Sequence, residues 1–168
     1  QKKSGADIMM IEVGGTVGEY ENILFMEAIR MMKQQHPADV MTIMLSYVPI
    51  PSKVGEMKTK PTQHAVRLLN GTGIFPDFLL CRASTPLDAP RKEKLSLFCN
   101  IPLSHIISAP DVASIYDIPD NFVHEGLDKK IITHLGLKKP LRPQQHLGWK
   151  KFVENTRKGR DEVRIALV

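Results

Sequence analysis

The sequence predicts a three-layer α/β fold, in which helices flank a mostly parallel β-sheet. Short apolar runs without helical period alternate along the chain with amphipathic stretches. Several of these runs end in glycine, proline or a charged residue, as buried parallel strands do. Strands that alternate with helices imply right-handed crossovers and a Rossmann-like sheet. The chain has 168 residues, of which 42% are hydrophobic, enough for one domain with a real core.

The first half of the chain contains the clearest elements. We expect a strand in "ADIMMIEVGG" (residues 6–15), a helix over 21–35 that stops before Pro37, and a second strand in "DVMTIMLSYV" (39–48). Pro61 suits the first turn of the next helix, where its missing N–H costs nothing, so Thr59 or Lys60 falls near the cap. That helix ends at "NGTG" (70–73).

The second half continues the alternation. We expect strands over 77–83 and 104–109, a helix over 90–99 between them, and a helical segment over 121–135. A proline-rich joint (140–143), a basic helix (144–158) and a final short strand, "VRIALV" (163–168), follow. Ligands of such sheets bind outside the carboxyl ends of the strands, so residues at those ends are candidates for chemistry.

Charge and cysteine usage exclude several classes of protein. The net charge is +5, but residues 138–160 hold eight Lys or Arg and one Glu, so that stretch carries +7 and the rest −2. Such local basicity favours a solvated helix face or a subunit contact over nucleic-acid binding. Cys81 and Cys99 lie in apolar surroundings, which favours buried free thiols. No apolar run is long enough for a membrane span, so we expect a soluble cytoplasmic protein.

Two stretches carry candidate ligand chemistry. "IEVGGTVGEYEN" (11–22) places Glu12 after a predicted strand, where a carboxylate suits Mg²⁺, and its glycines allow close backbone approach to a ligand. A tight structural turn, an exposed strand-end acid, and acids in a first helical turn (Glu19, Glu21) are the alternatives. In "EMKTKPTQHAV" (56–66), Lys58 and Lys60 alternate with threonines before a proline, which favours an anion-binding turn. The six histidines show no ligand spacing.

Four stretches together resemble the CTP synthase family, in the C-terminal part of its synthetase (amidoligase) domain: "IEVGGTVGEYEN", "GEMKTKPTQHAVRLLNGTGIFPDFLLCRA", "KEKLSLFCN" and "DVASIYDIP". The similarity covers about residues 7 to 135 and continues weakly to the end. The resemblance implies a ligase that forms a C–N bond: ATP phosphorylates the uracil 4-oxygen of UTP, and glutamine-derived ammonia displaces that phosphate to give CTP. It also implies a fold like that of P-loop NTPases and dethiobiotin synthetase.

The resemblance implies roles for particular residues. Glu12 would hold Mg²⁺, and Arg82, Asp111 and Val112 would bind ATP. UTP, or CTP as feedback inhibitor, would contact the following residues: Gly18, Glu19, Tyr20, Glu21, Lys58, Thr59, Lys60, Pro61, Thr62, Gln63 and Lys94. From the sequence alone, Lys94 lies in a charge run, "RKEK", that is typical of a solvated helix face. No catalytic residue is assigned. Glu19-Tyr20-Glu21 departs from the Asp-Ile-Glu common in the family, which bears on feedback inhibition.

The resemblance also implies a larger protein. A P-loop lysine, a second Mg²⁺ carboxylate and a glutaminase triad do not occur in these residues, so we expect an internal fragment that is inactive alone. The expected parts are a partial synthetase domain (1–139), a linker with a basic helix (140–162) and the first strand of a glutamine amidotransferase domain (163–168). The family is tetrameric, with GTP as a candidate activator. The alternatives are another dethiobiotin-synthetase-like amidoligase, or a non-catalytic nucleotide-binding assembly module.

Overall fold

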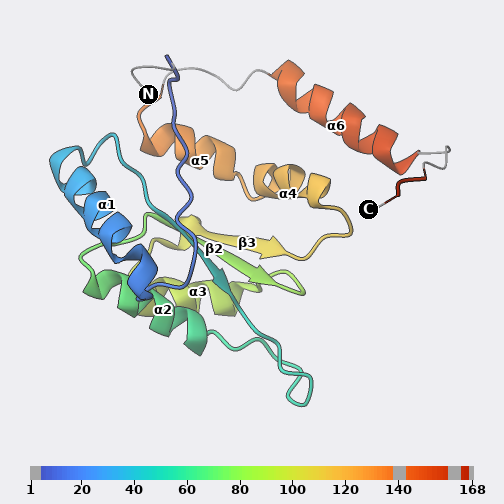
Figure 1. Ribbon diagram of the computed structural model, residues 1–168. Coiled ribbons are helices and arrows are strands. Elements are labelled where there is room, and N and C mark those ends of the chain that lie inside the picture. Colours follow the sequence, from blue (N-terminus) through green and yellow to red (C-terminus); the bar gives the residue numbers. More distant parts are fainter. Residues whose placement is uncertain (1–4, 138–142, 159–163, 167–168) are drawn as a thin grey trace. The chain divides into compact units, whose positions relative to one another are not determined.

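A parallel sheet of three strands organises the first of two units in this computed structural model, which describes residues 5–137, 143–158 and 164–166. The strands are β1 (Ile43–Tyr47), β2 (Phe78–Ala83) and β3 (Ile106–Pro110), with β2 in the middle (Figure 1). In register, Ile43 lies opposite Phe78, and Leu79 lies opposite Ile106. The predicted α/β class with a parallel sheet is therefore confirmed. The units are residues 1–110 and 111–168.

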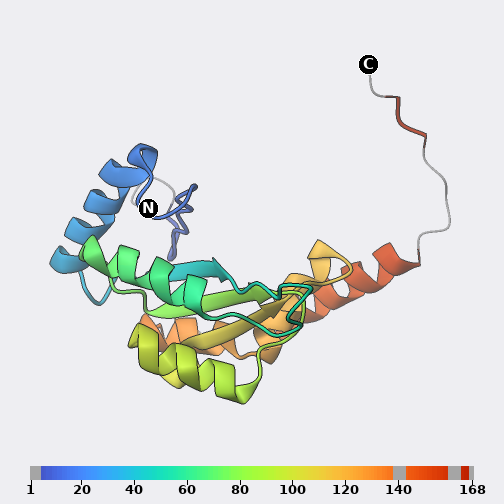
Figure 2. The ribbon, with the colours of Figure 1, turned by 90° about the horizontal axis from the view of Figure 1, so that it is seen from below.

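Helices of the first unit follow the predicted order. They are the short 3₁₀ helix η1 (Tyr20–Asn22), α1 (Ile23–Gln35), α2 (Lys60–Gly71), α3 (Ala89–Cys99) and the 3₁₀ helix η2 (Leu103–His105). Helix α2 packs against β1 and α3, and α3 also packs against β3, so both lie on one face of the sheet (Figure 2). Pro61 occupies the first turn of α2 and Thr59 is its N-cap residue, as predicted.

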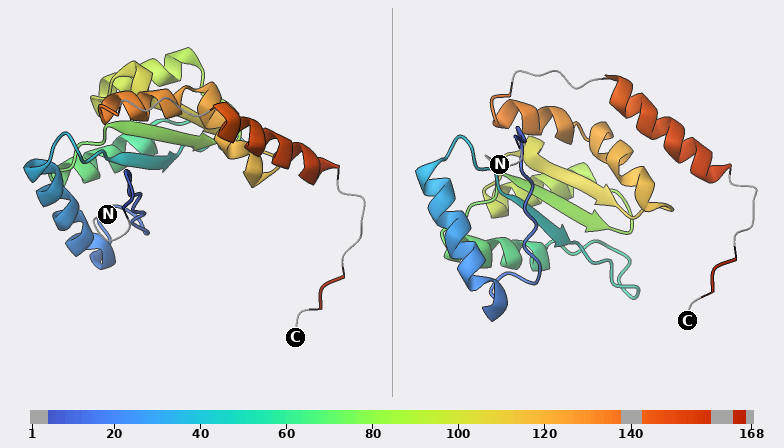
Figure 3. Two further views of the ribbon diagram at one scale, coloured as in Figure 1. Left: turned by 90° about the horizontal axis from the view of Figure 1, so that it is seen from above. Right: turned by 45° about the horizontal axis from the view of Figure 1, so that its top comes forward.

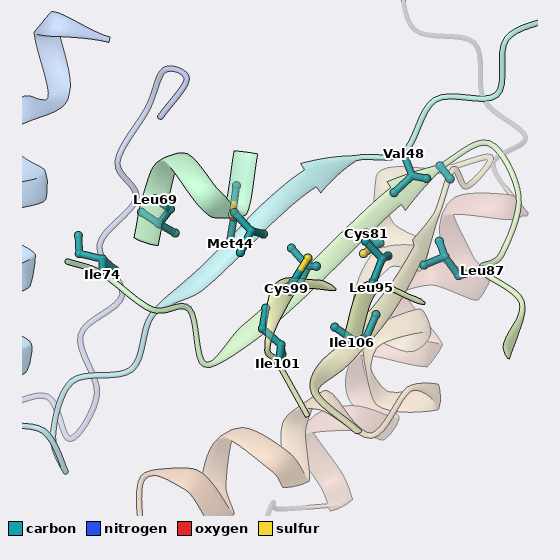
Figure 4. Close-up of a cluster of buried hydrophobic side chains, with 13 residues drawn as sticks. Met44, Val48, Leu69, Ile74, Cys81, Leu87, Leu95, Cys99, Ile101 and Ile106 are labelled. Carbon is teal, nitrogen blue, oxygen red and sulfur yellow. The ribbon is translucent and has the colours of Figure 1, made fainter. Parts of the chain in front are cut away.

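The core of this unit lies between that face and the two helices. Met44, Leu79, Cys81 and Ile106 come from the strands, whereas Leu69 of α2 and Leu95 and Cys99 of α3 come from the helices (Figure 4). The predicted buried free thiols are confirmed at both cysteines. Burial raises the pKa of the Cys99 thiol to about 11, because the thiolate would lose its hydration there.

Helix α1 contacts the core through two apolar side chains and the strands through Lys33. None of its residues is fully buried, although Met26 and Ile29 pack against the core (Figure 3 shows α1 to one side of the sheet). The ammonium group of Lys33 donates to Thr42 Oγ1 at 2.9 Å and pairs with the Asp77 carboxylate. Because Thr42 precedes β1 and Asp77 precedes β2, this cluster fastens α1 to the amino ends of two strands.

The predicted first strand is wrong. Residues 8–11 have no regular secondary structure, and their apolar side chains are exposed, up to 94% for Met10. An apolar run becomes a strand only when a neighbour completes its hydrogen bonds, and the described sheet ends at β1 and β3. The pattern indicated burial, but it did not identify the surface that would provide it.

The second unit is helical in its described part. It contains the 3₁₀ helix η3 (Ile115–Asp117), α4 (Ile118–His124), α5 (Leu127–His134) and α6 (Pro143–Arg157). The helical segment expected over 121–135 is confirmed, but as two helices, because Gly126 has a φ of 70° and separates α4 from α5. The basic helix expected over 144–158 is confirmed as α6.

Helix α6 is anchored to η3. Trp149 Nε1 donates to the Tyr116 carbonyl oxygen at 2.9 Å, and Arg157 pairs with Asp117 at 2.6 Å. The ring of Phe152 meets that of Tyr116 edge-on, with centroids 5.2 Å apart. The proline-rich joint expected over 140–143 lies outside the described residues except for Pro143. Of the strand expected over 163–168, the structure describes residues 164–166, which form no strand. None of the described helices is long and apolar enough to cross a membrane.

Candidate functional site

The loop from β1 to α2 is fixed by backbone hydrogen bonds at its two ends. Val48 N donates to the Arg82 carbonyl oxygen at 2.7 Å, which continues the strand pairing just past β1. Lys58 N donates to the Pro49 carbonyl oxygen at 2.9 Å, so the end of the loop returns to its start. Met57 packs against the hydrophobic core. The predicted anion-binding turn is thus a closed loop on the core, and not an extended tail.

Three of the predicted contact residues are buried where this loop joins α2. Thr59, Thr62 and Gln63 are 5%, 0% and 3% exposed. Thr62 Oγ1 accepts from Ser46 Oγ at 3.0 Å, and Gln63 Nε2 donates to Thr59 Oγ1 at 3.1 Å. In this structure these side chains bond to protein groups and support the loop. Their predicted contact with a nucleotide remains untested.

A cleft of about 340 Å³ opens between the loop and the beginning of α3. Its lining residues are Glu56, Met57, Lys58, Thr59, Lys60, Pro90, Arg91 and Lys94. Lys58 and Lys60 were predicted from the loop sequence and Lys94 from the family resemblance, and the structure brings all three together. Lys94 is exposed on α3 and lines the cleft, and its contact with a nucleotide stays a prediction.

Positive charge dominates the cleft. Lys58 forms an ion pair with Glu56, and this hydrogen bond, followed by the charges of Lys58, Arg91 and Lys94, lowers the pKa of the Glu56 carboxyl group. Within the part of the chain that the structure describes, Lys60 and Lys94 form no ion pair. Among the lining side chains, one carboxylate thus faces three lysines and Arg91, whose charge is shared with Asp88 outside the cleft, and the remaining excess of positive charge is suited to a polyanion.

Sequence reasoning did not identify Arg91 as a cleft residue. Its guanidinium pairs with the Asp88 carboxylate, and its Nε donates to the Met57 carbonyl oxygen at 3.5 Å. Asp88 is also the N-cap of α3 and accepts from Arg91 N at 3.0 Å. The available signal was the spacing of Asp88, Arg91 and Lys94, which puts all three on one side of a helix.

The glycine-rich stretch forms a second compact loop. Gly15 and Gly18 have φ values of 85° and 96°, a backbone region that favours glycine. Glu19 N donates to the Thr16 carbonyl oxygen at 3.1 Å, and Asn22 Nδ2 donates to the same oxygen at 2.9 Å. Asn22 is 5% exposed, and its Oδ1 accepts no hydrogen bond from any residue that the structure describes. Sequence reasoning also missed this residue.

The predicted contacts of this loop face solvent. Gly18, Glu19, Tyr20 and Glu21 are all exposed, Tyr20 to 89%. The Glu19 carboxylate folds back over Gly15, where an added Cβ would lie 2.5 Å from Glu19 Oε2. Val17 packs against the same core cluster as Met57. The glycine-rich stretch (11–22, the glycine loop) and the loop from β1 to α2 (48–59, the lysine loop) therefore rest on one core.

Glu12 fits a metal role only in part. It is exposed, and its Oε1 lies within 3.7 Å of the position that a Cβ on Gly14 would take. Among the described residues, no three His, Cys, Asp or Glu side chains gather closely enough to hold a metal ion. A single carboxylate is compatible with Mg²⁺ that is bound mainly by phosphates and water.

The predicted ATP-binding residues follow two strands. Arg82 lies in β2 opposite Tyr47 and Ala109 and is exposed, near the carboxyl end of its strand. Asp111 and Val112 come directly after β3 and belong to the second unit. Their positions in the chain agree with the strand-end rule, and their contact with ATP remains a prediction.

Comparison with known proteins gives a consistent result. A family model described as CTP synthase N-terminus matches residues 1–137. The chain is 39% identical to a CTP synthase of Acidiphilium cryptum (100% of this chain, 31% of the relative) and 43% identical to one of Chlamydia caviae (99% and 31%). It is 36% identical to a CTP synthase of Methanosarcina acetivorans (99% and 30%). The chain therefore spans about a third of the length of these curated relatives. The matched model covers the N-terminal part of the family and does not single out the C-terminal part of the synthetase domain that the resemblance suggested.

Proposed function

This chain belongs to the CTP synthase family, and we propose that it provides the pyrimidine-nucleotide site of an ATP-dependent ligase that converts UTP to CTP. In this reaction the γ-phosphoryl group of ATP moves to the 4-oxygen of UTP. Ammonia from glutamine then attacks carbon 4 and displaces inorganic phosphate. The activity is a proposal for the intact enzyme, because the chain spans 31% of its relatives' length.

The cleft between the lysine loop and α3 supports this proposal most directly. Lys58, Lys60 and Lys94 come from separate places in the sequence and line one cavity with Arg91. A nucleoside triphosphate carries several negative charges, and charge-assisted hydrogen bonds to ammonium groups are about twice as strong as neutral ones. We assign this cleft to the triphosphate of UTP. CTP has the same triphosphate, so it competes for the cleft as feedback inhibitor.

The glycine loop supplies the other proposed contacts. Gly18, Glu19, Tyr20 and Glu21 are exposed on a loop that shares a core with the lysine loop, and we assign them to the pyrimidine nucleotide. Glu12 would contribute one carboxylate to Mg²⁺, which would offset phosphate charge when bound. Arg82, Asp111 and Val112 are assigned to ATP. This chain's own residues thus bind and orient substrates, and no catalytic residue is assigned to them.

The remaining proposals concern the whole enzyme. We propose that this chain is the later part of the synthetase domain, with residues 1–139 inside it, 140–162 as a linker and 163–168 as the start of a glutaminase domain. The isolated chain would then not form CTP. A homotetramer, activation by GTP and a cytoplasmic location are further expectations from the family. The family match favours CTP synthesis over the other amidoligases of the dethiobiotin-synthetase-like type.

The test compares lysine variants of the intact enzyme. Lys60→Ala and Lys94→Ala should each raise the KM for UTP by about tenfold or more, because each removes a charge-assisted contact. Glutamine hydrolysis without nucleotide should be unchanged. Lys53→Ala is the matched control, since Lys53 lies in the same loop, is exposed and does not line the cleft. Unchanged UTP dependence in both cleft variants would remove the triphosphate from this cleft.

A further inference from the structure

Arg91 connects the two elements that carry the cleft lysines. Its Nε donates to the carbonyl oxygen of Met57, the residue before Lys58, at 3.5 Å. Its guanidinium also pairs with Asp88, the N-cap of α3. Arg91 itself lies three residues before Lys94 along this helix. The guanidinium therefore spans from the backbone of the lysine loop to the first turn of α3. The loop and α3 are separated by about thirty residues of sequence and by β2.

The contacts of Arg91 differ from those of two cleft lysines, Lys60 and Lys94. Two directions of its guanidinium are used for protein acceptors, and its charge is balanced by Asp88. Lys60 and Lys94 form no ion pair among the described residues, so their charges are available to a ligand. This division of contacts fits a residue that sets geometry, beside residues that bind the anion.

We propose that Arg91 is a positioning residue, which holds Lys58 and Lys94 at the spacing that a bound triphosphate requires. The proposal rests on the proposed function of the cleft as the UTP triphosphate site. The hydrogen bond that Arg91 Nε donates to the Met57 carbonyl oxygen links the backbone just before Lys58 to α3, and the ion pair with Asp88 orients the guanidinium at the first turn of α3. Without this bridge, each lysine keeps its charge but loses its set distance from the other.

Replacement by lysine separates geometry from charge. A guanidinium is planar and can donate in two directions from a fixed fork, whereas an ammonium is a point charge on a flexible stem. Arg91→Lys keeps the positive charge in the cleft but cannot hold the Met57 carbonyl and the Asp88 carboxylate in the same way. Arg91→Gln removes the charge as well. If Arg91 acts by position, both variants lose UTP affinity to a similar extent.

The experiment uses the intact enzyme with four variants: Arg91→Lys, Arg91→Gln, Asp88→Asn, and Lys92→Gln as the control. Lys92 is the next residue on α3 and does not line the cleft. We expect both Arg91 variants to raise the KM for UTP about tenfold, with kcat changed less than twofold and basal glutamine hydrolysis unchanged. Asp88→Asn should raise the same KM, and its combination with Arg91→Lys should be no worse than Arg91→Lys alone.

Two results would overturn the inference. A normal KM for UTP in Arg91→Lys, with a raised one in Arg91→Gln, would show that Arg91 acts by charge as a direct phosphate ligand. Normal values in both variants, while Lys60→Ala and Lys94→Ala bind UTP weakly, would show that the cleft needs no bridge. If the lysine variants also bind UTP normally, the assignment of the cleft fails first. The lysine variants therefore distinguish failure of the proposed function from failure of this inference.

Discussion

Ser46 in β1 donates a hydrogen bond to Thr62 in α2, with 3.0 Å between their hydroxyl oxygens. Thr62 in turn donates to the Tyr47 carbonyl oxygen at 3.3 Å, and its side chain is completely buried. The first turn of α2 is thereby fixed to the last residues of β1. Since Lys60 lies in that same turn, a buried pair of hydroxyls determines where a cleft lysine is presented.

Thr62→Val should destabilise the protein by about 1 to 3 kcal/mol, because the Ser46 hydroxyl and the Tyr47 carbonyl lose their buried partner. Unfolding by denaturant measures the change. Thr62→Ser is the matched control, since it keeps the hydroxyl and should retain most of the stability. A large loss in Thr62→Ser with little loss in Thr62→Val would indicate that the methyl contacts matter, and not the hydrogen bonds.

Glu56→Gln should tighten UTP binding by about two- to fivefold, as expected for loss of an exposed competing charge. Lys58 pairs with Glu56, and because this lowers the pKa of Glu56 below its ordinary value of 4.5, the carboxylate is ionised at neutral pH. A triphosphate must displace that carboxylate before it reaches Lys58. Calorimetric titration of the intact enzyme with UTP measures the effect.

Glu93→Gln serves as the control for this change. Glu93 is exposed on α3 and does not line the cleft, so its loss alters the net charge equally without freeing Lys58. Equal gains in affinity from both variants would mean that UTP senses only the overall charge of the protein. Weaker binding in Glu56→Gln would mean that Glu56 orients Lys58 toward the ligand.

The lysine loop shows why much of this site was predictable from sequence. Pro61 predicts a helix start, because it lacks a backbone N–H and its φ is already helical. The position of Lys60 in the first turn therefore follows from local sequence. The apolar run over 77–83 likewise became β2, since length and composition are typical of a covered strand. These features depend on neighbours in sequence.

Features that depend on distant partners were missed. In the sequence, Arg91 is one member of a charge run. Its contact could not be predicted, because the acceptor is the backbone carbonyl of Met57, and a carbonyl has no sequence signature. Nothing in the sequence around Asn22 indicates that its side-chain amide donates a hydrogen bond to the Thr16 carbonyl oxygen and so closes the glycine loop. The strand predicted over residues 8–11 was wrong for the same reason, because their apolar pattern indicated burial but did not identify the partner that would cover them.

Gly15→Ala should disturb the glycine loop, where Gly14→Ala should not. Gly15 has a φ of 85°, which costs an alanine about 1 to 2 kcal/mol, and its new Cβ would lie 2.5 Å from Glu19 Oε2. Gly14 has no such φ, and its nearest neighbour atom would be 3.7 Å away, an ordinary contact. Because Glu19 must move, inhibition by CTP should weaken in Gly15→Ala. Inhibition curves of the intact variants test this, and equal curves for both alanines would contradict it.

Cys99 should make the protein less stable at alkaline pH. Burial raises the pKa of its thiol from 9.0 to about 11, so the folded state keeps a proton that the unfolded state releases. Its stabilising contribution is complete below pH 9 and is lost as the pH rises to about 11, by at most about 1.4 kcal/mol per pH unit.

The free energy of unfolding, measured from pH 8 to 11, should therefore fall more steeply in the wild type than in Cys99→Ala. The alanine variant starts from a lower stability because it leaves a cavity, so the slopes are compared and not the absolute values. Parallel slopes would show that Cys99 ionises as easily in the folded protein as in the unfolded chain.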